Sequence, residues 1–151
     1  MLRCHGRRRN RISAISALTV SPRGRRVGLY TQFYRNRSIR EDEVIRFLQQ
    51  LLKHLRGQVV VLWDRINTHR SRKTQAFIER TPRLRAEYLP PYAPELNPVE
   101  TFWSLLKVHR LGNHGVFDVE VLHRRLNYHN GRLREDQRLL RGCIEHAGLP
   151  V

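Results

Sequence analysis

The sequence predicts a mixed α/β domain. Three observations predict it: β-prone segments joined by a turn at residues 11–34, a short continuous apolar run at residues 58–63, and amphipathic helical segments within residues 118–147. A hairpin, alternating β and α segments and a helical end are typical of this class. The chain has 151 residues, of which 40% are apolar, and this length suits one domain with a core of ordinary size.

The first two elements are an antiparallel hairpin and a helix. β-prone residues dominate 11–20 and 27–34, and the intervening sequence SPRG is a turn signal. A helix is predicted over 41–56, because apolar residues recur there at helical spacing and acidic and basic side chains occupy its first and last turns. Ser38-x-x-Glu41 has the form of an N-terminal capping box.

The segment 58–107 is predicted to form the core of the domain. The run QVVVLW at 58–63 indicates a buried, parallel strand that ends at Asp64. A helix around 74–80 and a strand at 84–89 follow, and then a proline-rich rigid loop. Asn97 is expected to cap the next helix, with Pro98 at its first position.

Two amphipathic helices are predicted in the helical end, near 118–129 and 135–147.

The charge balance points to nucleic acid. Lys and Arg number 29 against 13 Asp and Glu, a formal net charge of +16, and so basic a chain is expected to bind polyanions. No apolar run approaches the roughly 20 residues that span a bilayer, and no signal peptide is visible. Two cysteines give no disulfide framework, so we expect a cytoplasmic protein without a membrane partner.

Two carboxylates are candidates for catalysis. Asp64 follows a predicted strand at the sheet edge where α/β proteins bind ligands, and Glu100 lies in the first turn of a helix behind the rigid loop. Carboxylates on rigid elements could share divalent cations that act on a phosphodiester. Two simpler interpretations stay open: Asp64 as a turn residue, and Glu100 as the partner of Asn97 in a capping box.

Two motifs resemble the catalytic core of mariner-like insertion-sequence transposases, a bacterial group of DDE superfamily endonucleases. VVVLWDRINTHRS (59–71) resembles the motif of the second aspartate, and YLPPYAPELNPVETFWSLLK (88–107) resembles the motif of the third carboxylate, LPPYSPxLNPIExxWxxLK. Fainter similarity extends from about residue 6 to residue 130.

The resemblance implies a ribonuclease-H-like, retroviral-integrase-like mixed sheet with flanking helices. It implies that Asp64 and Glu100 are catalytic and bind a pair of Mg²⁺ or Mn²⁺ ions for cleaving and joining DNA. His69 would lie near the site, in a substrate-binding or a loop-orienting role. Arg70 and Lys107 are candidate DNA contacts, although Lys107 could equally be a solvated surface charge.

A further set of residues is expected to be structural. Phe102 is expected in the core, because its spacing is that of a buried helix stripe. The residues assigned to the structural loop and the helix behind it are Pro90, Pro91, Tyr92, Asn97, Pro98 and Trp103.

The chain departs from the family pattern at its start. The family's first Asp lies on a strand before the hairpin, whereas residues 1–40 contain eleven arginines and no Asp or Glu. We therefore expect residues 1–151 to form a single, N-terminally truncated catalytic domain without its first strand. Its metal site would be incomplete and the chain inactive alone. Both a frameshifted second half of a split element and a decayed remnant fit.

Three functions compete: the C-terminal fragment of a transposase, a catalytically inactive DNA-binding remnant, and an unrelated basic module such as a ribosome-associated protein. The segment LPPYAPELNPVE disfavours the third, since binding alone needs no carboxylate-bearing loop. The expected partners are DNA (element ends and target), the upstream-frame half of the transposase, and other copies of the chain.

Overall fold

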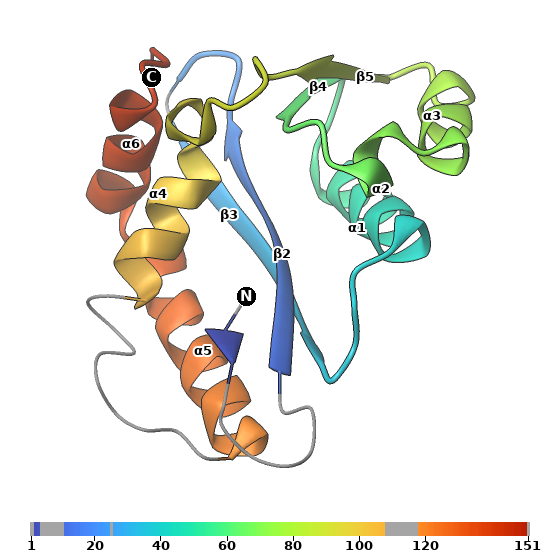
Figure 1. Ribbon diagram of the computed structural model, residues 1–151. Coiled ribbons are helices and arrows are strands. Elements are labelled where there is room, and N and C mark those ends of the chain that lie inside the picture. Colours follow the sequence, from blue (N-terminus) through green and yellow to red (C-terminus); the bar gives the residue numbers. More distant parts are fainter. Residues whose placement is uncertain (1, 4–10, 25, 108–117, 151) are drawn as a thin grey trace. The chain divides into compact units, whose positions relative to one another are not determined.

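The computed structural model describes residues 2–3, 11–24, 26–107 and 118–150. The arginine-rich segment 4–10 lies outside the described residues. Two compact units make up the chain: one joins the N-terminal 38 residues to everything from Pro98 onward, and the other spans Ile39–Asn97 (Figure 1).

The sheet of the first unit is the predicted hairpin with one short added strand. β2 (Arg11–Val20) pairs antiparallel with β3 (Val27–Arg35), and the two-residue strand β1 (Leu2–Arg3) pairs antiparallel with the start of β2. Gly28 lies directly across from Thr19, and a Cβ at this position would lie 2.5 Å from the Thr19 Oγ1. The register of the hairpin therefore requires glycine here.

The described part of the first unit also contains three helices: α4 (Pro98–Leu105), α5 (Val119–Glu135) and α6 (Gln137–His146). The helices and the hairpin share one apolar core, which includes Ile12, Leu29, Phe102, Leu126 and Leu140. The Gln137 amide fixes α6 to β3, because it accepts from the Val27 backbone N–H at 3.0 Å and donates to the Val27 carbonyl at 2.8 Å.

The predicted boundary between the last two helices was wrong. We expected the first of them to end near 129, but α5 continues through Gly131 to its end at Glu135. Leu133 is buried in the core, and this burial outweighs the low helix propensity of glycine. The chain turns instead at Asp136, whose side chain accepts a hydrogen bond from the first turn of α6.

The second unit begins with α1 (Glu41–His54) and contains two parallel strands, β4 (Val59–Trp63) and β5 (Leu84–Tyr88). Between them the chain forms α2 (Asn67–Arg70), which the sequence did not predict, and α3 (Arg72–Glu79). After β5 comes a single 3-10 turn, η1 (Pro94–Leu96). The buried apolar side chains of this unit are Val44, Phe47, Leu48, Leu51, Trp63 and Leu84.

The prediction that residues 58–63 form a buried, parallel strand was right in the pairing of β4 and wrong in the burial of two of its side chains. Its parallel pairing is confirmed, but Val60 is 59% exposed and Leu62 is 49% exposed. Side chains alternate between the two faces of a strand, and Trp63 turns to the packed face. The continuous apolar run of β4 therefore does not pack on both faces of the strand.

The capping box of α1 also differs from the prediction. The Glu43 carboxylate, not Glu41, accepts the Arg40 backbone N–H at 2.9 Å, and the Ser38 hydroxyl accepts from the Arg11 guanidinium instead. Glu43 is only 2% exposed, and its second oxygen lies 2.8 Å from the Arg46 guanidinium. Both oxygens of this buried carboxylate are thus satisfied.

No helix in the described part of the chain is long and apolar enough to cross a lipid bilayer.

Candidate active site

Asp64 lies at the carboxyl end of β4, where the sequence placed it. The parallel partner β5 ends at the same edge, and the Leu89 N–H donates to the Trp63 carbonyl at 2.9 Å, which extends the pairing by one residue. The Asp64 side chain is 46% exposed. A carboxylate at this edge is both held by the sheet and open to solvent.

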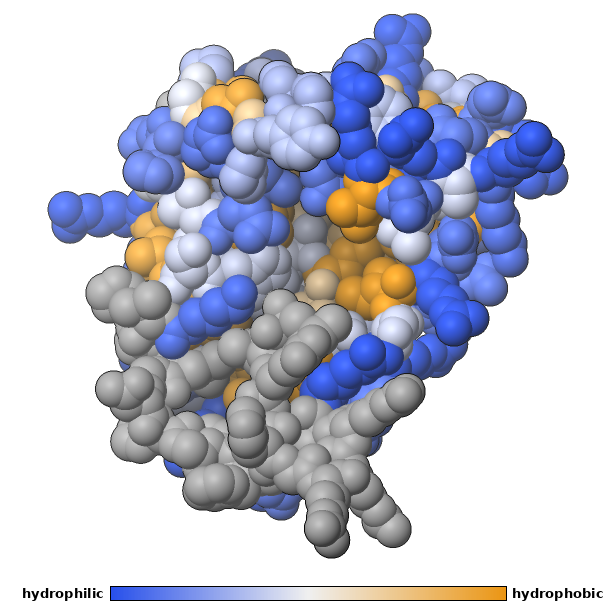
Figure 2. Space-filling model, in the orientation of Figure 1, coloured by the Kyte–Doolittle hydropathy of each residue, from blue (hydrophilic) through white to orange (hydrophobic). Residues whose placement is uncertain are grey.

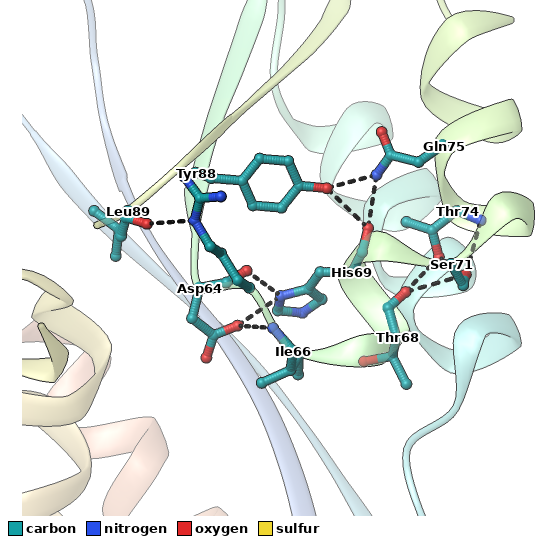
Figure 3. Close-up of polar contacts among 10 residues, drawn as sticks. Asp64, Ile66, Thr68, His69, Ser71, Thr74, Gln75, Tyr88 and Leu89 are labelled. Carbon is teal, nitrogen blue, oxygen red and sulfur yellow. Dashed lines mark hydrogen bonds and ion pairs between the residues drawn. The ribbon is translucent and has the colours of Figure 1, made fainter. Parts of the chain in front are cut away.

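The turn through α2 brings His69 back against Asp64. The His69 Nδ1 lies 2.8 Å from the Asp64 Oδ1 and 3.2 Å from the Asp64 carbonyl oxygen (Figure 3). The imidazole stacks on the Trp63 indole, with ring centroids 4.2 Å apart and planes inclined by 9°. Only 14% of the His69 side chain is exposed. The ring is therefore clamped between a strand residue and the candidate catalytic carboxylate.

The backbone of His69 is fixed by two further elements. Gln75 of α3 donates its amide to the His69 carbonyl at 2.7 Å and to the Tyr88 hydroxyl at 2.7 Å. Tyr88 of β5 in turn donates its hydroxyl to the same carbonyl at 3.3 Å, so both side chains converge on one oxygen (Figure 3). This brace holds the His69 backbone, while Trp63 and Asp64 hold its ring.

The hydrogen bond with His69 lowers the pKa of Asp64 below its usual value. Partial burial of Asp64 opposes the shift, while the charge of His69 and the Ile66 backbone N–H add to it. Asp64 is therefore ionised at neutral pH. Its Oδ1 faces His69, and no residue within the described ranges hydrogen-bonds its Oδ2, which leaves this oxygen open to a cation.

Glu100 lies in the first turn of α4 and is exposed. The helix begins at Pro98, as predicted, and its anchor is Phe102, which is fully buried. Trp103 packs beside it, 5.2 Å from the Phe102 ring and 6.3 Å from that of Phe33. Phe102 and Trp103 thus have the structural role predicted for them. The alternative that Glu100 completes a capping box with Asn97 stays open.

Asp64 and Glu100 belong to different units, so their meeting at one metal ion stays a prediction. Among the described residues, no three His, Cys, Asp or Glu side chains form a group that could hold a metal. Arg70 at the end of α2 and Lys107 after α4 are exposed. Their contact with DNA, and that of His69, likewise stays a prediction.

Sequence reasoning missed the residues that support His69. The aromatic stack on Trp63 and the brace from Gln75 and Tyr88 join residues up to 19 positions apart. One signal was available, since the five-residue separation of Asp64 and His69 allows one tight turn to return the chain to the strand end.

Solved structures of Mos1 mariner transposase superpose on this chain. The catalytic domain of Mos1 mariner transposase superposes with a TM-score of 0.60 and 14% identity, covering 93% of this chain and 83% of that one. The same domain with raltegravir and Mg superposes with a TM-score of 0.57 and 15% identity, covering 91% of this chain and 79% of that one. The Mos1 paired end complex with Mn superposes with a TM-score of 0.61 and 13% identity, covering 91% of this chain and 53% of that one. These matches confirm the ribonuclease-H-like α/β fold.

A search of curated protein sequences found no match. The family model described as DDE superfamily endonuclease matches residues 3–123, which is most of the chain. Together with the candidate carboxylate at the end of β4, this match places the chain in the DDE superfamily of endonucleases.

Proposed function

We propose that this chain is part of a DNA transposase and supplies Asp64 and Glu100 to a metal-dependent site that cleaves and joins DNA. The observation that carries the proposal is the state of Asp64: ionised, fixed by His69 and open at one oxygen. Two of the similar Mos1 structures are those of the catalytic domain with Mg and with Mn, and a third is a paired end complex with Mn. These structures support DNA and divalent cations as ligands of this chain.

The residues present fit a hard divalent cation, because Mg²⁺ and Mn²⁺ prefer carboxylate oxygens. When bound, such ions would activate a water or hydroxyl and stabilise charge on the leaving oxygen. Asp64 and Glu100 would hold them, and His69 would keep the Asp64 oxygens in one orientation. Arg70 and Lys107 would bind phosphates.

The first carboxylate is proposed to come from a segment other than residues 1–40, which contain no acid. We propose that the chain alone does not cleave DNA, because two carboxylates fix an ion pair poorly. An upstream half of the transposase and other copies of the chain are the proposed protein partners. In the described part, β4 pairs with β5 alone, so the other backbone edge of β4 suits an added strand.

A catalytically inactive DNA-binding protein is the second candidate. Its support is the net charge of +16, and hydrophilic side chains cover much of the described surface in Figure 2. Binding through charge alone needs neither an ionised Asp64 nor a clamped His69. These two features favour the catalytic site over the remnant.

Binding of a DNA end with and without Mn²⁺ separates the two candidates. Mn²⁺ should tighten binding by the wild-type chain, because Asp64 and Glu100 would hold the ion and its positive charge would attract a phosphate. Asp64→Asn and Glu100→Gln should each remove this increment and leave metal-free binding intact. Glu95→Gln, which changes an exposed acid in the proline loop, is the matched control. Equal binding with and without Mn²⁺ would favour the inactive remnant.

A further inference from the structure

Tyr92 combines full exposure with an unusual backbone conformation. Its relative exposure is 101%, and its φ is +59°, in the left-handed region. The other described non-glycine residue there is Asn36, a type that tolerates this region, and Asn36 exchanges hydrogen bonds with Arg11. Within the described ranges no partner binds the Tyr92 hydroxyl or stacks on its ring.

The loop around Tyr92 is stiff. Pro90 and Pro91 precede it and fix their own φ angles. Behind it, η1 closes with hydrogen bonds from the Leu96 N–H to the Ala93 carbonyl at 3.1 Å and from the Asn97 N–H to the Pro94 carbonyl at 3.0 Å. The frame therefore presents a bulky aromatic ring to solvent without packing it. Backbone strain of this kind is enriched at active sites and ligand-binding sites.

The root of this loop lies beside the candidate active site. Leu89 hydrogen-bonds to Trp63, the residue before Asp64, and the Arg65 side chain donates to the Leu89 carbonyl at 3.3 Å. Two residues, Pro90 and Pro91, lie between Leu89 and Tyr92, so the Cα atoms of Leu89 and Tyr92 are at most about 10 Å apart. Because one strand of B-DNA advances about 3.4 Å per base, this span between Leu89 and Tyr92 corresponds to roughly three nucleotides.

We propose that Tyr92 is a stacking platform for an unpaired nucleobase next to the phosphate held at Asp64. The inference rests on the proposed function and adds a contact with a single base at a distorted DNA end. An aromatic ring stacks on any base, and a preordered ring loses little entropy on binding. Arg65, which is exposed and whose guanidinium lies 5.5 Å from the Tyr88 ring centroid, supplies a cation for the adjoining backbone.

The test compares a blunt duplex with the same duplex carrying three mismatched terminal pairs, with 2-aminopurine in the unpaired strand. Tyr92→Phe keeps the ring, whereas Tyr92→Gly removes it and suits the positive φ. Tyr128→Ala is the control, because Tyr128 is 59% exposed but already bound by the Arg132 guanidinium.

The wild-type chain, Tyr92→Phe and Tyr128→Ala should prefer the unpaired end and quench 2-aminopurine. Tyr92→Gly should lose about 5–150-fold in affinity for that end, the range expected for one stacked base. Its binding to the blunt duplex should not change, and its melting temperature should be unchanged or higher.

Equal preference for the unpaired end by Tyr92→Gly and wild type would overturn the proposal, and so would equal losses on both duplexes. A loss of self-association in Tyr92→Gly without a change in end preference would assign the ring to a second copy of the chain and would also overturn it. If the wild-type chain bound neither duplex, the proposed function would fail as well. Intact Mn²⁺-dependent binding would confine the failure to Tyr92.

Discussion

Replacing His69 by alanine removes the ring that connects Trp63 to Asp64. The lost stack on Trp63 should cost about 1 kcal/mol beyond buried area. A hydrogen bond to a charged group contributes about 1.5–3 kcal/mol. The low end applies here because Asp64 is 46% exposed and solvent screens the pair. We expect His69→Ala to lower the free energy of unfolding by roughly 2–3 kcal/mol in total.

The same change should raise the pKa of Asp64, since the hydrogen bond with His69 is the largest cause of its lowered value. A carboxyl with a depressed folded-state pKa contributes stability above its unfolded value of about 3.9, and this contribution is lost as pH falls through the folded pKa. The stability difference between wild type and His69→Ala should therefore narrow as pH falls below about 4.

Urea unfolding across this pH range measures the stability, and carboxyl NMR measures the pKa of Asp64. His69→Phe keeps an aromatic ring for Trp63 and removes the hydrogen bond, so it should raise the pKa with a smaller loss of stability. His123→Ala, a histidine of α5 in the other unit, is the control. The reasoning is refuted if His69→Ala changes stability by less than about 0.5 kcal/mol, the usual effect of a surface substitution, and leaves the pKa of Asp64 in place.

The other predictions concern DNA binding, the buried carboxylate and association. DNA affinity should fall steeply and linearly on a log–log plot against salt, because the +16 chain releases counterions on binding; a flat plot would contradict this. Glu43→Ala should lower the free energy of unfolding, measured in urea, by about 1–3 kcal/mol, because the Arg40 backbone N–H loses its acceptor. Glu41→Ala should lower it far less. Equal effects of the two changes would be inconsistent with the observed cap. Light scattering should show that the isolated chain self-associates, and the double variant Val60→Lys, Leu62→Lys should associate less. A monomeric wild type would show that the exposed apolar residues of β4 do not cause association.

Sequence patterns correctly predicted the elements whose formation depends on neighbouring residues. The hairpin follows from β-prone segments around a turn, and the start of α4 follows from Pro98. The capping box of α1 was misplaced because Ser38, although suitable in type, is engaged by Arg11 from a distant strand. The end of α5 was missed for a related reason, since burial of Leu133 overrides the local signal of Gly131.

The sequence predicted the candidate carboxylates of the site, but it did not predict the residues that hold His69 in place. A strand end followed by Asp64 is visible in sequence, and so is a nearby histidine. The contact of Tyr88 with His69 depends on the register of β5 against β4, which hydrophobic periodicity does not specify. The loop at Tyr92 was predicted to be rigid, but the positive φ and the full exposure of Tyr92 were not predicted, because no sequence pattern specifies them.

The central claim is that Asp64 and Glu100 serve one metal site. Mn²⁺ binding, followed by electron paramagnetic resonance, should be measured for the wild-type chain, Asp64→Asn, Glu100→Gln, the double variant and the Glu95→Gln control. If the two carboxylates share an ion, each single variant should lose most of the binding and the double variant should lose little more, with a coupling energy of about 0.5–3 kcal/mol. Independent, additive losses, or wild-type binding in either single variant, would contradict the shared site.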